Sequence, residues 1–139
     1  MPEQPRFDLP VIEPESQPFW DAAKEGRLLI QRCEACGRAQ HYPRPFCVTC
    51  WSDRVRWEDA SGRGTIYTYS VVHVNDLAPF AERVPYVAAA VDLEEGPRIM
   101  TNIVGADTAE LRVGAPVLVD FQQLTDEITA PVFRLAETD

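Results

Sequence analysis

The four cysteines are the residues whose type and spacing could do chemistry. They form two Cys-x-x-Cys pairs, Cys33 with Cys36 and Cys47 with Cys50. A pair at this spacing suits a tight turn that points both sulfurs at one ion, and Gly37 supplies the left-handed backbone freedom that such a turn needs. Two turns give four thiolates, which form a closed tetrahedral set for zinc. The sequence therefore predicts a structural zinc site with no open position for water or substrate.

Other uses of the same cysteines must be weighed against zinc. Disulfides need an oxidising compartment, and the polar, acidic start of the chain does not resemble a secretory signal. A redox Cys-x-x-Cys explains one pair and leaves the other without a role. Iron in a rubredoxin-like centre takes the same four ligands, so the sequence favours zinc and leaves iron open.

The elements that position the cysteines form a small module over residues 27–58. Residues 27–32 predict a strand that leads into the first pair, and residues 55–58 alternate as a returning strand does. Between the pairs, residues 41–46 form a loop that contains two prolines. A module of this size cannot fold by burying surface alone, so we expect the metal to supply its stability.

Residues 1–26 predict an extended arm followed by a short helix. Prolines recur among the acidic residues of segment 1–18, which excludes an interior helix or a central strand there. Ser16 fits a helix N-cap and Gly26 fits the end of that helix. We expect the apolar side chains of the arm to lie against its own domain or a partner; they are Phe7, Leu9, Val11 and Ile12.

Residues 59–139 predict a small antiparallel barrel. The strongest strand signal covers residues 65–73, where β-branched and aromatic residues follow one another without a breaker. The remaining expected elements are strands over 86–93, 98–104, 117–121 and 132–135, with a short helix or turn over 108–113. Five strands with one short helical insertion favour the OB fold. The whole chain is thus predicted to be mainly β: an arm and short helix, a rubredoxin-like zinc ribbon, then a five-stranded OB-fold barrel.

The net charge of −9 is spread unevenly along the chain. Residues 1–26 carry −4, residues 27–58 carry +3 and residues 59–139 carry −8. This acidic balance argues against nucleic-acid binding, which needs a basic surface. The chain has no apolar run long enough to span a membrane, so no membrane association is expected and the predicted compartment is the cytoplasm.

This order of parts resembles the DUF35 family, which is described as rubredoxin-like zinc ribbon plus OB-fold acyl-CoA-associated proteins. The resemblance covers nearly the whole chain from Phe7 onward. Besides the two cysteine pairs with Gly37, it rests on Pro18-Phe19-Trp20, Gly26-Arg27-Leu28, the stretch from Gly62 to Tyr69, Val71-Val72-His73 and Val113-Gly114. The zinc ribbon followed by Gly-Arg-Gly-Thr and a tyrosine-containing strand is more specific than the cysteine pairs alone.

Members of this family look like accessory subunits of thiolase-fold enzymes, including the lipid-transfer-protein type. The resemblance implies a non-catalytic subunit that helps to bind or channel an acyl-CoA, for example in steroid side-chain aldol cleavage or in acyl-CoA condensation. The thiolase-like partner would hold the catalytic residues. The sequence agrees in one respect, because its only histidines are His41 and His73 and metal claims its cysteines. The sequence therefore favours a chain without catalytic activity of its own, and it leaves open whether the isolated chain is an enzyme.

Candidate contacts with acyl-CoA or with the partner lie in the predicted barrel. Arg63 lies between two glycines and suits a CoA phosphate, although a turn that needs glycine explains the same pattern. Tyr67, Tyr69 and His73 share one face by the period of two, where they would line a ligand groove or belong to the core.

The long apolar loop over residues 74–85 is typical of a functional or partner-facing segment, and within it Leu77 and Phe80 are the candidate contacts. Two function classes compete with this interpretation. The barrel could bind single-stranded nucleic acid through stacking aromatic residues, against which the charge of residues 59–139 weighs. The cysteines could also make the protein a rubredoxin-like iron electron carrier.

Overall fold

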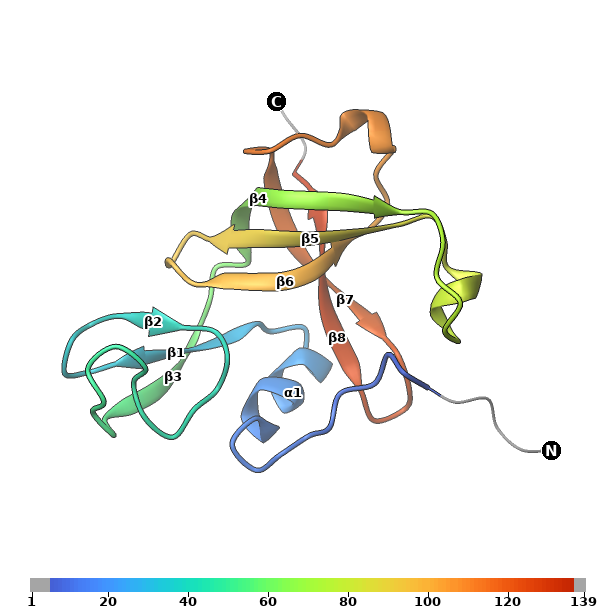
Figure 1. The fold of residues 1–139 in the computed structure, drawn as a ribbon. Coiled ribbons are helices and arrows are strands. Elements are labelled where there is room, and N and C mark those ends of the chain that lie inside the picture. Colours follow the sequence, from blue (N-terminus) through green and yellow to red (C-terminus); the bar gives the residue numbers. More distant parts are fainter. Residues whose placement is uncertain (1–5, 137–139) are drawn as a thin grey trace.

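The computed structural model describes residues 6–136, in which one α-helix accompanies a three-stranded sheet and a closed five-stranded barrel (Figure 1). The arm leads into helix α1 (Gln17–Lys24). Phe19, Ala22 and Ala23 form the buried stripe of this helix, as expected for residues spaced by three and four. Ser16 occupies the N-cap position, but its Oγ accepts from the backbone N–H of Glu13 and makes no capping bond to the helix.

The three-stranded sheet carries the cysteine pairs. Its order is β2-β1-β3, with β1 (Leu29–Cys33) in the centre, β2 (Ala39–Gln40) on one side and β3 (Val55–Asp59) on the other. Both pairings are antiparallel. The strands expected before and after the cysteines are confirmed with shifts of one or two residues. Strand β2 was not predicted, because a two-residue strand has no periodicity to detect.

The barrel has the strand order β4-β5-β6-β8-β7 and closes between β7 and β4. Neighbouring strands are antiparallel except β6 and β8, which are parallel. This arrangement confirms the mainly β architecture and is consistent with the predicted OB fold. The strands are β4 (Arg63–Val72), β5 (Tyr86–Leu93), β6 (Arg98–Ile103), β7 (Pro116–Gln123) and β8 (Thr129–Leu135).

Two short 3-10 helices lie in the connections of the barrel. The first, η1 (Phe80–Glu82), interrupts the long loop between β4 and β5. The second, η2 (Thr108–Glu110), is the predicted helical insertion between β6 and β7, and it is shorter than the expected 108–113. The side chain of Asp107 accepts from the backbone N–H of Ala109 at its start.

A β-bulge in β4 changes the faces of its aromatic residues. The register against β5 shifts between Ile66 and Thr68, so Tyr67 has no partner in that strand. An extra residue reverses the alternation of side chains beyond it. Tyr69 therefore packs against the core together with Ile66, whereas Tyr67 is 50% exposed. The expectation that Tyr67 shares a face with Tyr69 and His73 is wrong for this reason.

One hydrophobic cluster joins the barrel to the segments before it. Phe19 of α1, Leu28 and Ile30 belong to the same cluster as the barrel residues Ile66 and Phe133. The two cysteine turns contribute no residue to it. Helix α1 and strand β1 thus pack against the barrel core. The cysteine turns do not, so other contacts must hold their conformation.

Candidate functional site

The two cysteine turns have the same backbone hydrogen bonds. In the first, the N–H of Gly37 donates to the carbonyl of Cys33 at 2.8 Å; in the second, the N–H of Trp51 donates to the carbonyl of Cys47 at 2.9 Å. Gly37 has φ +79° and Trp51 has φ +67°, so both turns end in the left-handed region. That conformation suits glycine and is unusual for tryptophan. At the equivalent left-handed position the second turn therefore has the side chain of Trp51, whereas the first turn has glycine.

The sulfur atoms lie where one metal ion could bind all of them. Sγ of Cys33 is 3.6 Å from Sγ of Cys50, and Sγ of Cys36 is 3.7 Å from Sγ of Cys47. All four sulfurs lie within 4.8 Å of one another. Tetrahedral thiolates at a zinc–sulfur distance of about 2.3 Å are separated by about 3.8 Å. The predicted ligands thus come together with spacings that fit a tetrahedral metal site.

The backbone around Cys33 and Cys47 favours their thiolates, the form that binds metal. The N–H of Cys36 donates to Sγ of Cys33 at 3.5 Å, and the N–H of Thr49 donates to Sγ of Cys47 at 3.4 Å. Hydrogen bonds from the backbone N–H groups of Cys50 and Thr49 lower the pKa of Cys47 to about 6. Cys33 and Cys47 are buried and Cys36 and Cys50 are exposed, so the site lies at the surface with one side covered.

The candidate contact residues of β4 do not form one site. Arg63 is exposed at the start of the strand, and its flanking glycines have a packing reason. A Cβ at Gly62 would lie 2.5 Å from Val119 Cγ1, and one at Gly64 would lie 2.6 Å from the carbonyl oxygen of Asp92. Close packing within the barrel therefore explains both glycines without a ligand.

The aromatic candidates face different surroundings. The hydroxyl of Tyr69 donates to the carbonyl of Leu111 at 3.1 Å from the core side of the barrel. Tyr67 lies on the outside, where the guanidinium carbon of Arg98 sits 3.4 Å from the centre of its ring. His73 lies beyond the end of β4 and is exposed, as is Leu77. The ring centre of Phe80 lies 6.1 Å from that of Tyr86.

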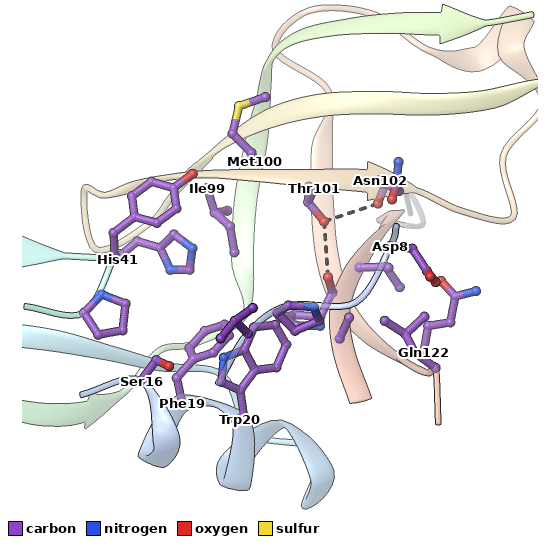
Figure 2. Close-up of a pocket in the computed structure, with 18 of the residues that line it drawn as sticks. Asp8, Ser16, Phe19, Trp20, His41, Ile99, Met100, Thr101, Asn102 and Gln122 are labelled. Carbon is purple, nitrogen blue, oxygen red and sulfur yellow. Dashed lines mark hydrogen bonds between the residues drawn. The ribbon is translucent and has the colours of Figure 1, made fainter. Parts of the chain in front are cut away.

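A cavity of about 510 Å³ opens where the arm, α1, the 41–44 loop and the barrel meet (Figure 2). Of the six candidate contact residues only Phe80 lines it. Figure 2 shows Phe19 and Trp20 of α1 on one side and the β6 residues Ile99 and Thr101 on the other. Segments far apart in the sequence form these walls, so no local pattern could have revealed the cavity.

A buried amide network holds the loop that closes one end of this cavity. The side chain of Gln31, in β1, accepts from the backbone N–H of Arg44 at 3.0 Å and donates to the carbonyl of Arg44 at 3.1 Å. The side-chain amide of Gln40 donates to Gln31 Oε1 at 2.7 Å and to the carbonyl of Phe46 at 3.2 Å. These bonds orient the loop whose first residue is His41. Sequence reasoning missed both glutamines, because nothing local distinguishes them from solvated ones.

His41 is the buried histidine of the chain, with 9% of its surface exposed. Its ring centre lies 5.4 Å from that of Phe19 and 4.6 Å from that of Tyr42. Burial lowers the pKa of His41 to about 4, so the ring is neutral near pH 7. Its Nδ1 has no hydrogen-bond partner within residues 6–136.

None of the helices in the described part of the chain is both long and apolar enough to cross a membrane. Within that same part, the four cysteines are the cluster of side chains that could hold a metal ion.

Comparison with known proteins places both halves of the chain in one family. Residues 20–56 match the family model described as "ChsH2, rubredoxin-like zinc ribbon domain", and residues 57–122 match "ChsH2, C-terminal OB-fold domain". A solved structure, the "Ltp2-ChsH2(DUF35) aldolase", has a chain with a TM-score of 0.81 and 39% identity. The match covers 91% of this chain and 98% of that one.

Curated relatives differ in length. A "probable enoyl-CoA hydratase alpha subunit" of Thermomonospora curvata is 40% identical over 91% of this chain, which spans only 39% of that relative. A "benzoylsuccinyl-CoA thiolase subunit BbsA" of Geobacter metallireducens is 30% identical over 53% of this chain and 48% of its own length. A "DUF35 domain-containing scaffold protein" of Methanocaldococcus jannaschii is 37% identical over 78% of this chain and 77% of its own length. The chain therefore belongs to the DUF35 family.

Proposed function

We propose that this chain is a non-catalytic, acyl-CoA-associated accessory subunit of a thiolase-fold enzyme of the lipid-transfer-protein type. The observation that carries the proposal is the likeness to one chain of the Ltp2-ChsH2(DUF35) aldolase over almost the full length of both. The relatives named as a thiolase subunit and as scaffold proteins support the same role. In this role the catalytic groups belong to the partner, and this chain provides surfaces that contact the partner and the acyl-CoA.

Zinc is the metal we propose for the cysteine site. The thiolates of Cys33, Cys36, Cys47 and Cys50 would hold it, and their spacing fits a tetrahedral ion. Zinc bound by four protein ligands acts structurally, since no position remains for water or substrate. Residues 1–26, 27–58 and 59–139 would then act as arm and helix, zinc ribbon and OB-fold domain.

The long loop between β4 and β5 is the segment we propose for partner contact. Leu77 is exposed there, and Phe80 lies half-buried beside it in η1. The loop is held in place, because Arg83 is paired at 2.9 Å with Asp8 of the arm. Arg63, Tyr67, Tyr69 and His73 stay candidates for acyl-CoA contact. Of these, Arg63 is the one whose exposed guanidinium suits a phosphate.

Co-expression with a thiolase-fold subunit of the lipid-transfer-protein type tests the partner. We expect the two chains to co-elute in size-exclusion chromatography with a mass that includes both. Leu77→Glu should weaken the complex by placing a charge in the interface, while Leu118→Glu, at another exposed leucine, should leave it intact. Separate elution of the wild-type chains would refute the proposal.

Acyl-CoA association is tested by equilibrium dialysis with the complex and with each chain. We expect the complex to retain more acyl-CoA than the thiolase-fold subunit alone. Thioester cleavage by the isolated chain would instead reveal an enzyme. Tight, salt-sensitive binding of a short oligonucleotide, or a visible iron–thiolate absorption of the purified protein, would favour the competing function classes.

A further inference from the structure

The cavity beside α1 has the size and lining of a small-molecule site. Its volume of about 510 Å³ lies within the range of ligand pockets, roughly 300 to 1,000 Å³. Most of the residues that line it are apolar or aromatic. The buried apolar residues among them are Phe19, Ile99 and Val132, and Trp20 is partly buried beside them. An apolar body of ligand size would be stabilised here by removal of its surface from water.

One buried polar side chain in this lining has a nitrogen without a hydrogen-bond partner among residues 6–136. His41 lines the cavity and is nine-tenths buried, yet its Nδ1 is out of contact with solvent and has no hydrogen-bond partner within residues 6–136. Leaving a buried polar group unpaired is unfavourable, because the group has lost its water and gained no partner. A half-turn of the ring about its Cβ–Cγ bond exchanges its two edges, so either edge can supply the nitrogen. An occupant with a hydroxyl or carbonyl oxygen would remove this cost.

The charged groups near the cavity already have partners, or they lie at its rim. Asp8 is paired with Arg6 and Arg83, each at 2.9 Å. A guanidinium nitrogen of Arg44 donates to the carbonyl of Pro43 at 2.8 Å, and Glu13 is exposed. His41 is neutral near pH 7, so it offers no charge to a buried ion. Burying a charged ligand group here would be costly, and the buried part of an occupant should therefore be neutral.

We propose that this cavity binds a neutral, largely apolar group that carries one hydroxyl or carbonyl oxygen, and that His41 bonds that oxygen. The acyl part of a hydroxyacyl or oxoacyl thioester has this chemistry, so the inference rests on the proposed function and extends it. This inference places the acyl part in the cavity beside α1, away from the candidate CoA contact Arg63 and from the outer face of β4. His41 is here a ligand-binding residue that recognises one oxygen.

The test uses displacement of a neutral fluorescent probe, N-phenyl-1-naphthylamine, from the full-length metal-loaded chain. The competitors are 4-butylphenol and butylbenzene, which differ by one hydroxyl. An apolar cavity without a hydrogen-bond partner favours butylbenzene, since the hydroxyl would lose its water. With His41 as partner we expect 4-butylphenol to displace the probe at a roughly 3- to 10-fold lower concentration.

The variant His41→Leu should reverse this order, because leucine keeps the apolar wall and removes the hydrogen bond. Arg112→Leu is the matched control, at an exposed residue outside the lining of this cavity, and should leave the order unchanged. Methyl NMR on labelled isoleucine gives a second measurement, because the buried side chain of Ile99 lines the cavity and its signal should shift on addition of 4-butylphenol. That signal also reports whether His41→Leu is folded.

Several results would overturn the proposal. One is that neither compound displaces the probe. Another is that His41→Leu keeps the preference for 4-butylphenol over butylbenzene. A third is that the thiolase-fold partner displaces the probe, which would make a segment of the partner the occupant. Co-elution of His41→Leu with the partner separates this inference from the proposed function. A variant that binds the partner but has lost its preference for the phenol supports both. Preserved selectivity without any partner binding would sink the proposed function alone.

Discussion

The cysteine turns and the barrel are held together by different means. In the barrel, fully buried side chains such as Phe133 and Val91 pack in one hydrophobic cluster. The cysteine turns add nothing to that cluster, and beside them Phe46 and Trp51 stack at 5.2 Å with 74% of Trp51 exposed. The turns have little apolar surface to bury, so their shape must come from metal ligation and from the Gln31–Gln40 network.

This contrast predicts which region a given substitution should destabilise. A lost metal ligand should unfold a local unit, whereas a lost core side chain should weaken the whole barrel. Strand β1 joins the two regions, because Ile30 lies in the barrel's cluster and Cys33 ends the strand at the metal site. Variants in each region test how sharply the two regions are separated.

The largest effect is expected from Cys47→Ser. Removing one thiolate should abolish tight metal binding and unfold residues 33–56 locally, since metal binding supplies about 10–16 kcal/mol in comparable zinc peptides. We expect one zinc per chain in the wild type, none in the variant, and loss of partner binding. Metal analysis and amide hydrogen exchange measure this, and β5 should keep its protection. A variant that kept its metal and its ribbon protection would contradict the structural role.

Phe133→Ala should have the next largest effect. Its side chain is fully buried at the centre of the cluster, so truncation leaves a cavity and should lower the free energy of unfolding by about 3–5 kcal/mol. Urea unfolding followed by circular dichroism measures the change, with the exposed arm residue Phe7→Ala as control. Unlike Cys47→Ser, this variant should still bind metal in its folded form. Equal losses at both phenylalanines would argue against the observed core.

Gln31→Leu tests the network that holds the 41–46 loop onto β1 and β2. Leucine removes both hydrogen bonds to the backbone of Arg44 and leaves those groups unpaired, which should cost about 1–3 kcal/mol. Hydrogen exchange should rise in the 41–46 loop and stay unchanged in β4. Gln123→Leu, at an exposed strand end, is the matched control. No rise in exchange at Arg44 would show that the network does not hold the loop.

The smallest effect concerns the arm and depends on pH. Ion pairs with Arg6 and Arg83 lower the pKa of Asp8 to about 2, and its side chain is 4% exposed. A carboxyl whose pKa is lowered on folding stabilises the protein above its unfolded pKa near 4 and loses that contribution as the pH falls toward 2.

Asp8→Asn should therefore lower the free energy of unfolding by about 1 kcal/mol at neutral pH, and the gap to the wild type should close as the pH falls to about 2. Thermal melts of both proteins across this pH range measure the gap. Asp126→Asn, at an exposed position, is the control. A gap that stayed constant down to about pH 2 would mean that Asp8 acts through something other than its charge.

Much of the fold could be predicted from local patterns. The cysteine spacing predicted which sulfurs meet, and the runs at residues 65–73 and 86–93 predicted the neighbouring strands β4 and β5 of the barrel. Metal turns and strands each depend on a few consecutive residues, so short stretches of sequence carry the signal. The bulge at Tyr67 was missed, because it depends on how β4 pairs with β5 and leaves no mark on the periodicity of β4 alone.

The sequence by itself determined which four cysteines come together, the order along the chain of all strands except β2, and the resemblance to a family. Only the tertiary structure decided which side chains meet across those elements. His41 lies in an unremarkable loop, yet its ring is buried against Phe19 of α1, beside a cavity that β6 and β8 also line. Burial, pairing and cavities are properties of contacts between distant segments, whereas cysteine spacing and strand periodicity are properties of neighbouring residues.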